Sequence, residues 1–248
     1  MIHKIIFFIL FAGFSMASVA YGQLLSWSFF KSDYVDSYKD EGESLGAQFL
    51  LPRFPEHHLL VGYTFTTRTY GDGTKFRKNN FSVGDTWAPA GHAYYVETAL
   101  DYAGSTPVGA TSMYGITPHL TYFNNWDLGL GLKNASYQTG SIFILNPQVM
   151  YLSGPWIFGF GSWVFNDNGS HATFREFARY TTQAKLKIEA SVTGGETRED
   201  VGVVDQFNAY GVNVSKFWKS FGLGVMAERY EGKLRKGNSF QVEFQWQW

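Results

Sequence analysis

The chain has 248 residues, which is enough for one large domain or two small ones. Aromatic residues make up 19% of it and charged residues only 17%, against roughly 25% charged residues in an ordinary soluble domain. Cysteine is absent, which excludes disulfide bonds and thiolate metal sites. The formal net charge of -1 argues against nucleic acid or any other strongly charged partner.

The chain begins with features of a secretory signal peptide. Lys4 gives a short basic end, residues 5–19 form an apolar run, and small residues allow cleavage after Ala20 or Gly22. We therefore expect a cleaved signal peptide over 1–22 and a mature domain over 23–248. The alternative is an uncleaved anchor, for which the run is short.

After residue 23 the sequence contains no apolar run near the roughly 18 residues that a membrane helix needs. A chain of this kind enters a membrane only as a closed β-barrel, because lipid offers the backbone no hydrogen-bond partners.

The mature part alternates with a period of two, and a helical period is nowhere sustained. Fourteen segments show this alternation: 24–35, 44–51, 58–70, 79–88, 93–103, 112–123, 126–137, 141–152, 155–166, 172–181, 184–195, 205–217, 220–230 and 239–248. The pattern predicts one all-β domain, a transmembrane up-and-down antiparallel β-barrel. Twelve strands are the alternative if 44–51 and 172–181 are not strands.

The two ends of these segments indicate a membrane. Their apolar faces often begin and end with Tyr, Trp or Phe, as in the aromatic girdles of barrels. Longer polar or glycine-rich connectors alternate with tighter turns, and we expect them at 36–43, 71–79, 104–111, 168–172, 196–205 and 232–238. The stretch 52–58 is expected to be an unusually long turn on the short side. This asymmetry is typical of bacterial outer-membrane barrels with periplasmic termini.

The final stretch "SFQVEFQWQW" places its aromatic residues on one face and its Gln and Glu residues on the other. In a closed barrel this strand pairs with the first one, so no edge is left free. We expect Phe244, Trp246 and Trp248 to form the signal read by the outer-membrane assembly machinery. The expected partners are that machinery and outer-membrane lipid, and the barrel is expected to be a monomer.

Three stretches carry a resemblance to a known family: "FFKSDYVDSYKDEGESLGAQFLLP", "SVGDTWAPAGHAYYVETALDYA" and "FGLGVMAERYEGKLRKGNSFQVEFQWQW". With them the chain resembles the YaiO-type outer-membrane proteins over most of its mature length. The resemblance implies an outer-membrane barrel, and some relatives are joined to helical repeats or linked to envelope polysaccharide. The sequence shows no such repeats, which weakens a polysaccharide role. The resemblance brings no functional residues.

The face assignment places a set of charged and titratable residues in the lumen: Arg68, Glu97, Asp101, His119, Lys133, Arg175, Arg179, Lys185, Lys187, Glu189, Glu228 and Glu243. They predict either a mixed-charge channel with a solute site or a network of paired charges that plugs the barrel. We expect an anion site at Arg175, Arg179, Lys185 and Lys187, which Glu189 neutralises in part.

Other motifs give weaker indications of chemistry. Ser170 and His171, with Asp167 nearby, are candidates for nucleophilic catalysis, but adjacent loop residues supply neither a positioned base nor an oxyanion site. Glu56 to His58 could offer two or three ligands to a metal, although neighbouring strand residues point to opposite faces, so His57 and His58 would not readily converge. The carboxylates of 40–43 and 197–200 could hold calcium weakly. We expect solvated loops and turns at these places, with no metal, cofactor or enzyme activity.

Three functions follow from these patterns. The first is a narrow channel or docking barrel for small or envelope-related solutes. The second is a closed structural barrel that interacts through its outer loops. The third is an outer-membrane enzyme that acts on lipid or glycan. The sequence does not identify the solute or glycan.

Overall fold

The computed structural model describes residues 24–35, 37–51, 54–104, 110–123, 125–138, 140–166, 169–200 and 203–247. For 198–200 and 203 it describes the backbone alone. The regular secondary structure of the described residues consists of strands, which are joined by turns. The strands are β1 (Leu24–Val35), β2 (Tyr38–Leu51), β3 (Phe54–Tyr70), β4 (Lys75–Trp87), β5 (Tyr94–Tyr102), β6 (Ser112–Tyr122), β7 (Trp126–Tyr137), β8 (Gly140–Ser153), β9 (Trp156–Asn166), β10 (Ser170–Thr181), β11 (Leu186–Asp200), β12 (Val203–Trp218), β13 (Phe221–Gly232) and β14 (Lys236–Gln247).

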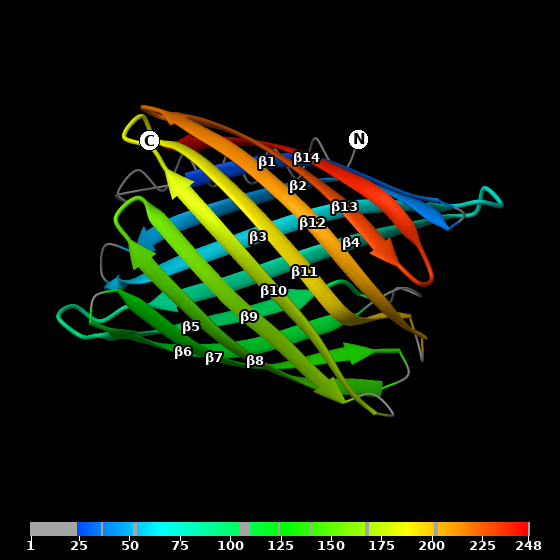
Figure 1. Ribbon diagram of the computed structural model, residues 1–248, viewed down its shortest axis with the longest axis horizontal. Helices are drawn as coiled ribbons and strands as arrows, with labels where there is room; N and C mark the ends of the chain where they lie inside the picture. Colours follow the sequence, from blue (N-terminus) through cyan, green and yellow to red (C-terminus); the bar gives the residue numbers. More distant parts are fainter. Residues whose placement is uncertain are drawn as a thin grey trace.

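Each strand pairs antiparallel with its neighbours in the sequence, and β1 pairs with β14 to close the barrel (Figure 1). That closing ladder runs from Leu24 opposite Gln247 to Val35 opposite Lys236. The predicted barrel and its count of fourteen strands are confirmed. The alternative of twelve is wrong, because 44–51 lies within β2 and 172–181 within β10. No helix among the described residues is long and apolar enough to cross a membrane.

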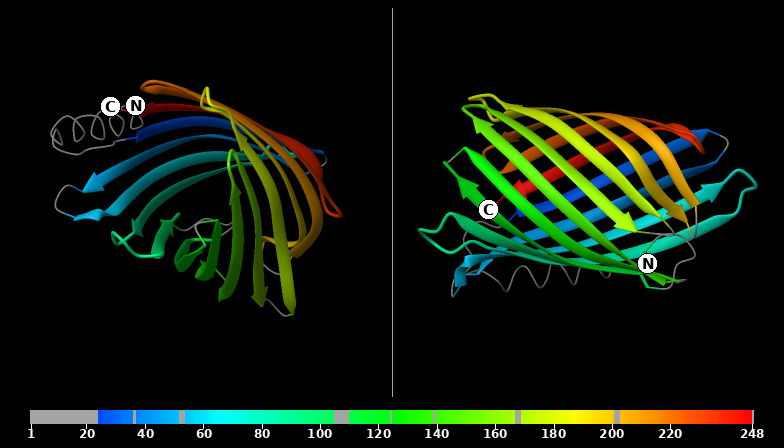
Figure 2. Two further views of the ribbon diagram at one scale, coloured as in Figure 1. Left: turned by 60° about the vertical axis from the view of Figure 1, so that its left-hand side comes forward. Right: turned by 60° about the horizontal axis from the view of Figure 1, so that its bottom comes forward.

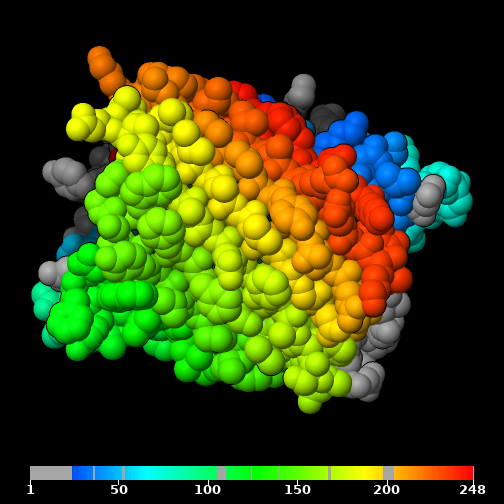
Figure 3. Space-filling view, viewed as in Figure 1, coloured from blue at the N-terminus to red at the C-terminus, as the bar shows by residue number. Residues whose placement is uncertain are grey.

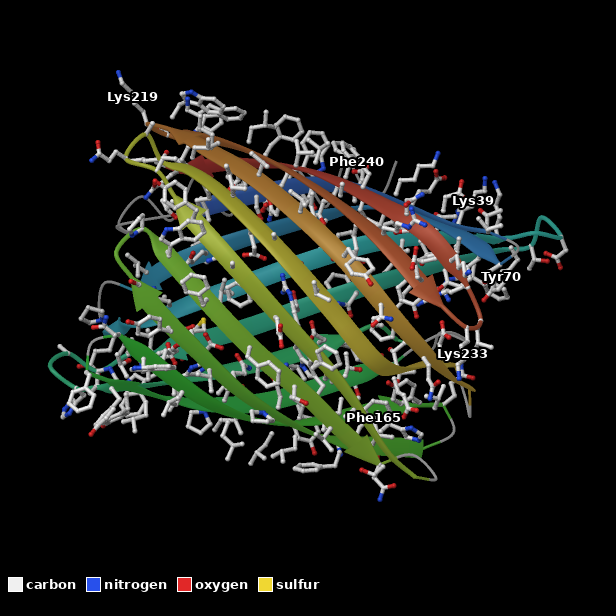
Figure 4. The ribbon with its side chains drawn as sticks, in the orientation of Figure 1. Lys39, Tyr70, Phe165, Lys219, Lys233 and Phe240 are labelled. Carbon is white, nitrogen blue, oxygen red and sulfur yellow. The ribbon has the colours of Figure 1, made fainter. Side chains whose placement is uncertain are left out.

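Because the sequence alternates with a period of two, apolar and polar side chains lie on opposite faces of the barrel wall. Trp27 of β1 lies opposite Phe244 of β14 and Leu45 of β2, so these three side chains share one face. Many large apolar side chains on this face are exposed, as are Val212 and Phe240. Figure 4 shows Phe240 pointing away from the barrel, and Figure 3 shows side chains covering the outer surface over β8 to β14. An apolar outer face of this extent is what a lipid-covered barrel presents.

The two ends of the barrel differ. We call the end with Leu24 and Gln247 the terminal end and the other the far end. Lys219, in the turn between β12 and β13, lies at the terminal end, whereas Lys39, Tyr70 and Lys233 lie at the far end (Figure 4). The turn between β3 and β4 projects beyond its neighbours at the far end (Figures 1 and 2).

The long polar connectors expected at the far end are mostly strand, which corrects the sequence interpretation. β2 begins at Tyr38, β4 at Lys75 and β14 at Lys236, while β11 continues to Asp200. The ladders continue because inward side chains of these polar stretches pair with one another. Asp40, for example, lies opposite Arg68 and binds it. Polar composition therefore did not signal a loop here.

The expected long turn at 52–58 is also corrected, since β3 begins at Phe54. The register of β2 against β3 shifts between Leu50 and Leu51, so a bulge takes up residues that the sequence assigned to the turn. The predicted signal peptide and Trp248 lie outside the described residues.

Candidate functional site

Among the charged side chains of the inner wall, three groups are each held by several contacts. Glycines allow larger groups to lie flat on this wall. A Cβ added to Gly129 would lie 2.8 Å from the ring of His119, and one added to Gly131 would lie 3.1 Å from Thr117 Oγ1. Because these positions have no side chain, their neighbours on β6 pack against the backbone.

The first charged group is the Glu189 triad, formed by Arg175 and Arg179 of β10 and Glu189 of β11. Arg175 Nη2 donates to Glu189 Oε1 at 2.7 Å, while Arg179 donates to Oε2 through Nε at 2.8 Å and Nη2 at 2.6 Å. The ring of Phe177 lies between the guanidinium groups, 5.5 and 5.6 Å from their Cζ atoms. One carboxylate thus serves two cations, and the triad keeps a net positive charge.

The predicted anion site is only partly assembled. Lys187 lies on the inward face of β11, next but one to Glu189. Lys185, however, lies in the turn before β11, with a φ of 58°, and its N–H donates to the Thr182 carbonyl at 3.0 Å. The structure therefore places Lys185 at the rim of the terminal end, because the chain reverses there before the alternation begins.

The second group lies on β5 to β7 and centres on a histidine that is almost fully buried. His119 Nδ1 lies 2.7 Å from Asp127 Oδ1, and Tyr95 donates to Asp127 Oδ2 at 2.6 Å. The rings of Tyr95 and His119 stack at 4.2 Å. On the other side, His119 Nε2 faces Glu97 Oε2 at 3.6 Å. The side chain of His119 is 2% exposed but that of Glu97 is 49% exposed, so Glu97 borders the lumen.

A small cavity opens beside this group, between β5 and β8, and we call it the β5–β8 cavity. Its volume is about 140 Å³. Residues from four neighbouring strands line it, among them Glu97, Asp101, Thr117, Lys133 and Gln148. Three of the predicted lumen charges therefore meet at one hollow of the wall.

The third group closes one side of the far end and forms the mouth cluster of Tyr34, Tyr38, Tyr230 and Arg235. The Arg235 Cζ lies 4.5, 5.2 and 4.6 Å from the ring centroids of Tyr34, Tyr38 and Tyr230. Burial lowers the pKa of the Arg235 guanidinium from its usual value. The turn 233–235 is thus held against the inner wall by cation–π contacts.

Two further contacts fix this turn and its surroundings. Asp205 of β12 accepts from the Tyr230 hydroxyl at 2.9 Å and from the Leu234 N–H at 3.0 Å. Arg68 binds Asp40 in a fork at 2.9 and 2.8 Å, and its Cζ lies 3.6 Å above the ring of Tyr38. The predicted lumen residue Arg68 therefore serves as part of the packing at the far end.

The remaining predicted lumen residues, Glu228 and Glu243, lie half-buried on the inward faces of β13 and β14. Sequence reasoning missed Asp127, Asp205 and Arg235. Asp127 was visible as the polar partner in "WDLGLGLK", but nothing in the sequence pairs it with His119. Arg235 stood in a stretch interpreted as a polar loop.

The catalytic and metal candidates do not converge. Ser170 and His171 were expected in a loop but belong to β10, because the ladder with β9 begins at Ser170. Ser170 is exposed, Asp167 lies outside the described residues, and His171 Nδ1 lies 2.6 Å from Glu196 Oε2. His57 Nδ1 lies 2.6 Å from Asp85 Oδ2. His58 points to the opposite face of the strand from His57. Within the part of the chain that the structure describes, no three His, Asp or Glu side chains group as metal ligands would.

The carboxylates that were expected to bind calcium weakly do not converge among the described residues either. Asp40 faces inward and binds Arg68, whereas Glu41 and Glu43 are exposed on neighbouring alternate positions of β2. In 197–200, the side chains from residue 198 onward lie outside the described set. Alternation of the strand thus separates the carboxylates of the first stretch.

No known protein family and no curated protein matches the chain. Solved structures match nearly all of it. Omp33 of Acinetobacter baumannii matches with a TM-score of 0.58 at 10% identity, over 93% of this chain and 99% of that one. A loop-deletion mutant of OmpT, an outer membrane protein of Vibrio cholerae, matches with a TM-score of 0.53 at 9% identity, over 92% and 99%.

The β domain of the Bordetella autotransporter Brka is also similar, with a TM-score of 0.50 at 14% identity over 92% of this chain and 99% of that one. The chain therefore has the fold of bacterial outer-membrane β-barrels. Because the identities are this low, the likeness concerns the fold alone.

Proposed function

We propose that the protein is a monomeric barrel of the bacterial outer membrane that gives small solutes a narrow, water-filled passage. The location is supported by the shared fold, the apolar outer face and the aromatic girdles. In this proposal the termini are periplasmic, outer-membrane lipid covers the wall, and the assembly machinery reads the last strand. The YaiO-type resemblance agrees with this assignment and supplies no ligand.

The exposure of inward-facing charges carries the proposal. The side chains of Arg175 and Arg179 are 42% and 38% exposed although they lie on the inner wall. In a barrel whose interior is filled by side chains, such groups would be buried against partners. Their exposure indicates space for water in the lumen, and the net charge of the Glu189 triad favours anions.

The test is single-channel conductance of residues 23–248 refolded into a planar bilayer, after circular dichroism has established the β signal. We expect steady current steps. Arg175→Met together with Arg179→Met should shift the reversal potential toward cation selectivity, because both positive charges are lost. Lys216→Met is the matched control, since Lys216 packs on Trp218 of the outer face. A folded but silent protein contradicts the passage.

The mouth cluster favours a second candidate, a closed barrel that interacts through its far end. Its contacts hold the turn 233–235 inward over the lumen. In that case Arg235→Ala should convert a silent protein into a conducting one, because the turn loses its aromatic contacts. A wild-type protein that already conducts as strongly as Arg235→Ala contradicts this candidate.

A further inference from the structure

The β5–β8 cavity exists because two small inward residues, Ala99 and Gly115, are surrounded by residues with longer side chains. On the inward face, Glu97 lies opposite Thr117, Ala99 opposite Gly115, and Asp101 opposite Met113. The next strand places Lys133 opposite Gly115. Ala99 and Gly115 thus form a low floor, and the longer side chains around them form the rim.

The side chain of Lys133 leans over this floor. A Cβ at Gly115 would lie 2.8 Å from Lys133 Cγ, so the lysine stem crosses the glycine. Among the described residues, its ammonium makes neither an ion pair nor a hydrogen bond. An ammonium placed on a wall of this kind is costly to leave unpaired unless water or a ligand reaches it.

The carboxylates across the cavity are also available. Asp101 makes no ion pair or hydrogen bond with a described residue, although it lies within the electrostatic influence of Lys78. The ammonium of Lys78 donates to the Ala110 carbonyl at 3.4 Å. Glu97 keeps half of its surface open, with the buried His119 behind it at 3.6 Å.

The cavity therefore presents an ammonium on one side and carboxylates on the other, and the two signs do not pair within it. A ligand with a single charge satisfies one side and leaves the other unpaired. A ligand with both charges satisfies both, and the amide of Gln148 and the hydroxyl of Thr117 add hydrogen-bonding groups at the rim.

We propose that the β5–β8 cavity binds a small zwitterionic solute that carries an ammonium and a carboxylate. Lys133 and Gln148 receive the carboxylate, while Glu97 and Asp101 receive the ammonium. His119, held by Asp127 and Tyr95, acts as a positioning residue for Glu97. The volume of about 140 Å³ restricts the ligand to a molecule of amino-acid size. The inference rests on the proposed passage, which must admit the solute.

The experiment measures binding in detergent micelles and passage in bilayers separately. The binding probes are glycine, β-alanine and 4-aminobutanoate, with butanoate and butylammonium as single-charge analogues. We expect the best zwitterion to bind about tenfold more tightly than either analogue, because it adds a second charge-assisted contact. Equal binding of a zwitterion and a single-charge analogue overturns the inference.

Variants locate the site. Lys133→Met and Asp101→Asn should each reduce zwitterion binding to the level of the single-charge analogues. Ala99→Leu fills the floor while keeping every charge, and should weaken binding as well. Lys216→Met is the matched control, because it removes a lysine of the outer face that packs on Trp218. A loss with Lys216→Met equal to that with Lys133→Met shows that the loss is not specific to the cavity and overturns the inference.

The two assays separate the two proposals. Conductance without zwitterion binding overturns the site and leaves the passage standing. Binding without conductance supports the site and contradicts the passage. A folded protein that neither conducts nor binds contradicts both.

Discussion

Two walls of the same lumen differ in how their charged side chains are paired. On β10 and β11, both arginines are bound to Glu189 within 2.8 Å, and Phe177 fills the space between them. On β5 to β8, Lys133 makes no ion pair or hydrogen bond with a described residue. The first wall pairs both of its arginines with a carboxylate, whereas the second presents Lys133 to the cavity.

The difference follows from the residues between the charges. An aromatic ring at Phe177 fixes the separation of two guanidinium groups so that one carboxylate reaches both. On the other wall, Ala99 and Gly115 leave a low floor, and Lys133 makes no ion pair with a carboxylate among the described residues. Charges that are paired stabilise the barrel, and charges that face a hollow are available for a solute.

The largest effect is expected from Glu189→Gln. The variant removes the negative charge and one of the two oxygens that accept three short hydrogen bonds, so two guanidinium groups lie near each other without a counter-charge. We expect the free energy of unfolding to fall by about 1–3 kcal/mol, discounted because both arginines are partly exposed. Urea titration of the refolded barrel measures this loss. Anion selectivity should rise in the same variant, and an unchanged reversal potential would contradict the role of the triad.

Asp127→Asn tests the one strongly paired part of the second wall. It weakens the contact to His119 and the acceptor for Tyr95, both largely buried. We expect a loss of about 1–2 kcal/mol in the free energy of unfolding. The measurement is again urea titration, and Asp101→Asn is the control because Asp101 makes no such bonds. Equal losses in the two variants would remove the distinction between paired and unpaired carboxylates.

Arg175→Met should have a smaller effect on stability. Arg179 still binds Glu189 through two nitrogens, so the carboxylate keeps a partner. We expect a loss below about 1 kcal/mol, as for partly exposed ion pairs. The shift in reversal potential toward cations should be about half that of the double variant. A loss as large as that of Glu189→Gln would show that the triad is not shared as the geometry indicates.

The smallest effect on stability is expected from Lys133→Met. The lysine makes no ion pair or hydrogen bond with a described residue, and methionine covers the same glycine floor with its stem. We expect a change within about 0.5 kcal/mol in the free energy of unfolding, even though zwitterion binding is lost. A destabilisation comparable to Asp127→Asn would mean that Lys133 is a structural residue.

At the far end the structure differs from what the sequence predicts. Stretches rich in charge, such as 36–43 and 232–238, were interpreted as loops because polar composition usually marks them. Their strands continue because inward residues pair across the wall, as Asp40 does with Arg68. The inward packing of Arg235 depends on tyrosines from three other strands, and no local pattern contains that information.

The sequence by itself determined the barrel, its fourteen strands and which side chains lie on the outer face of the wall. These properties follow from a period of two, which is local and repeats along the chain. Only the tertiary structure decided which lumen charges meet, because register between strands sets their partners. It places Glu189 within hydrogen-bond distance of two arginines, and it places Lys133 beside a cavity. It also places Lys185 in a turn, where the backbone reverses and the alternation of side chains no longer applies.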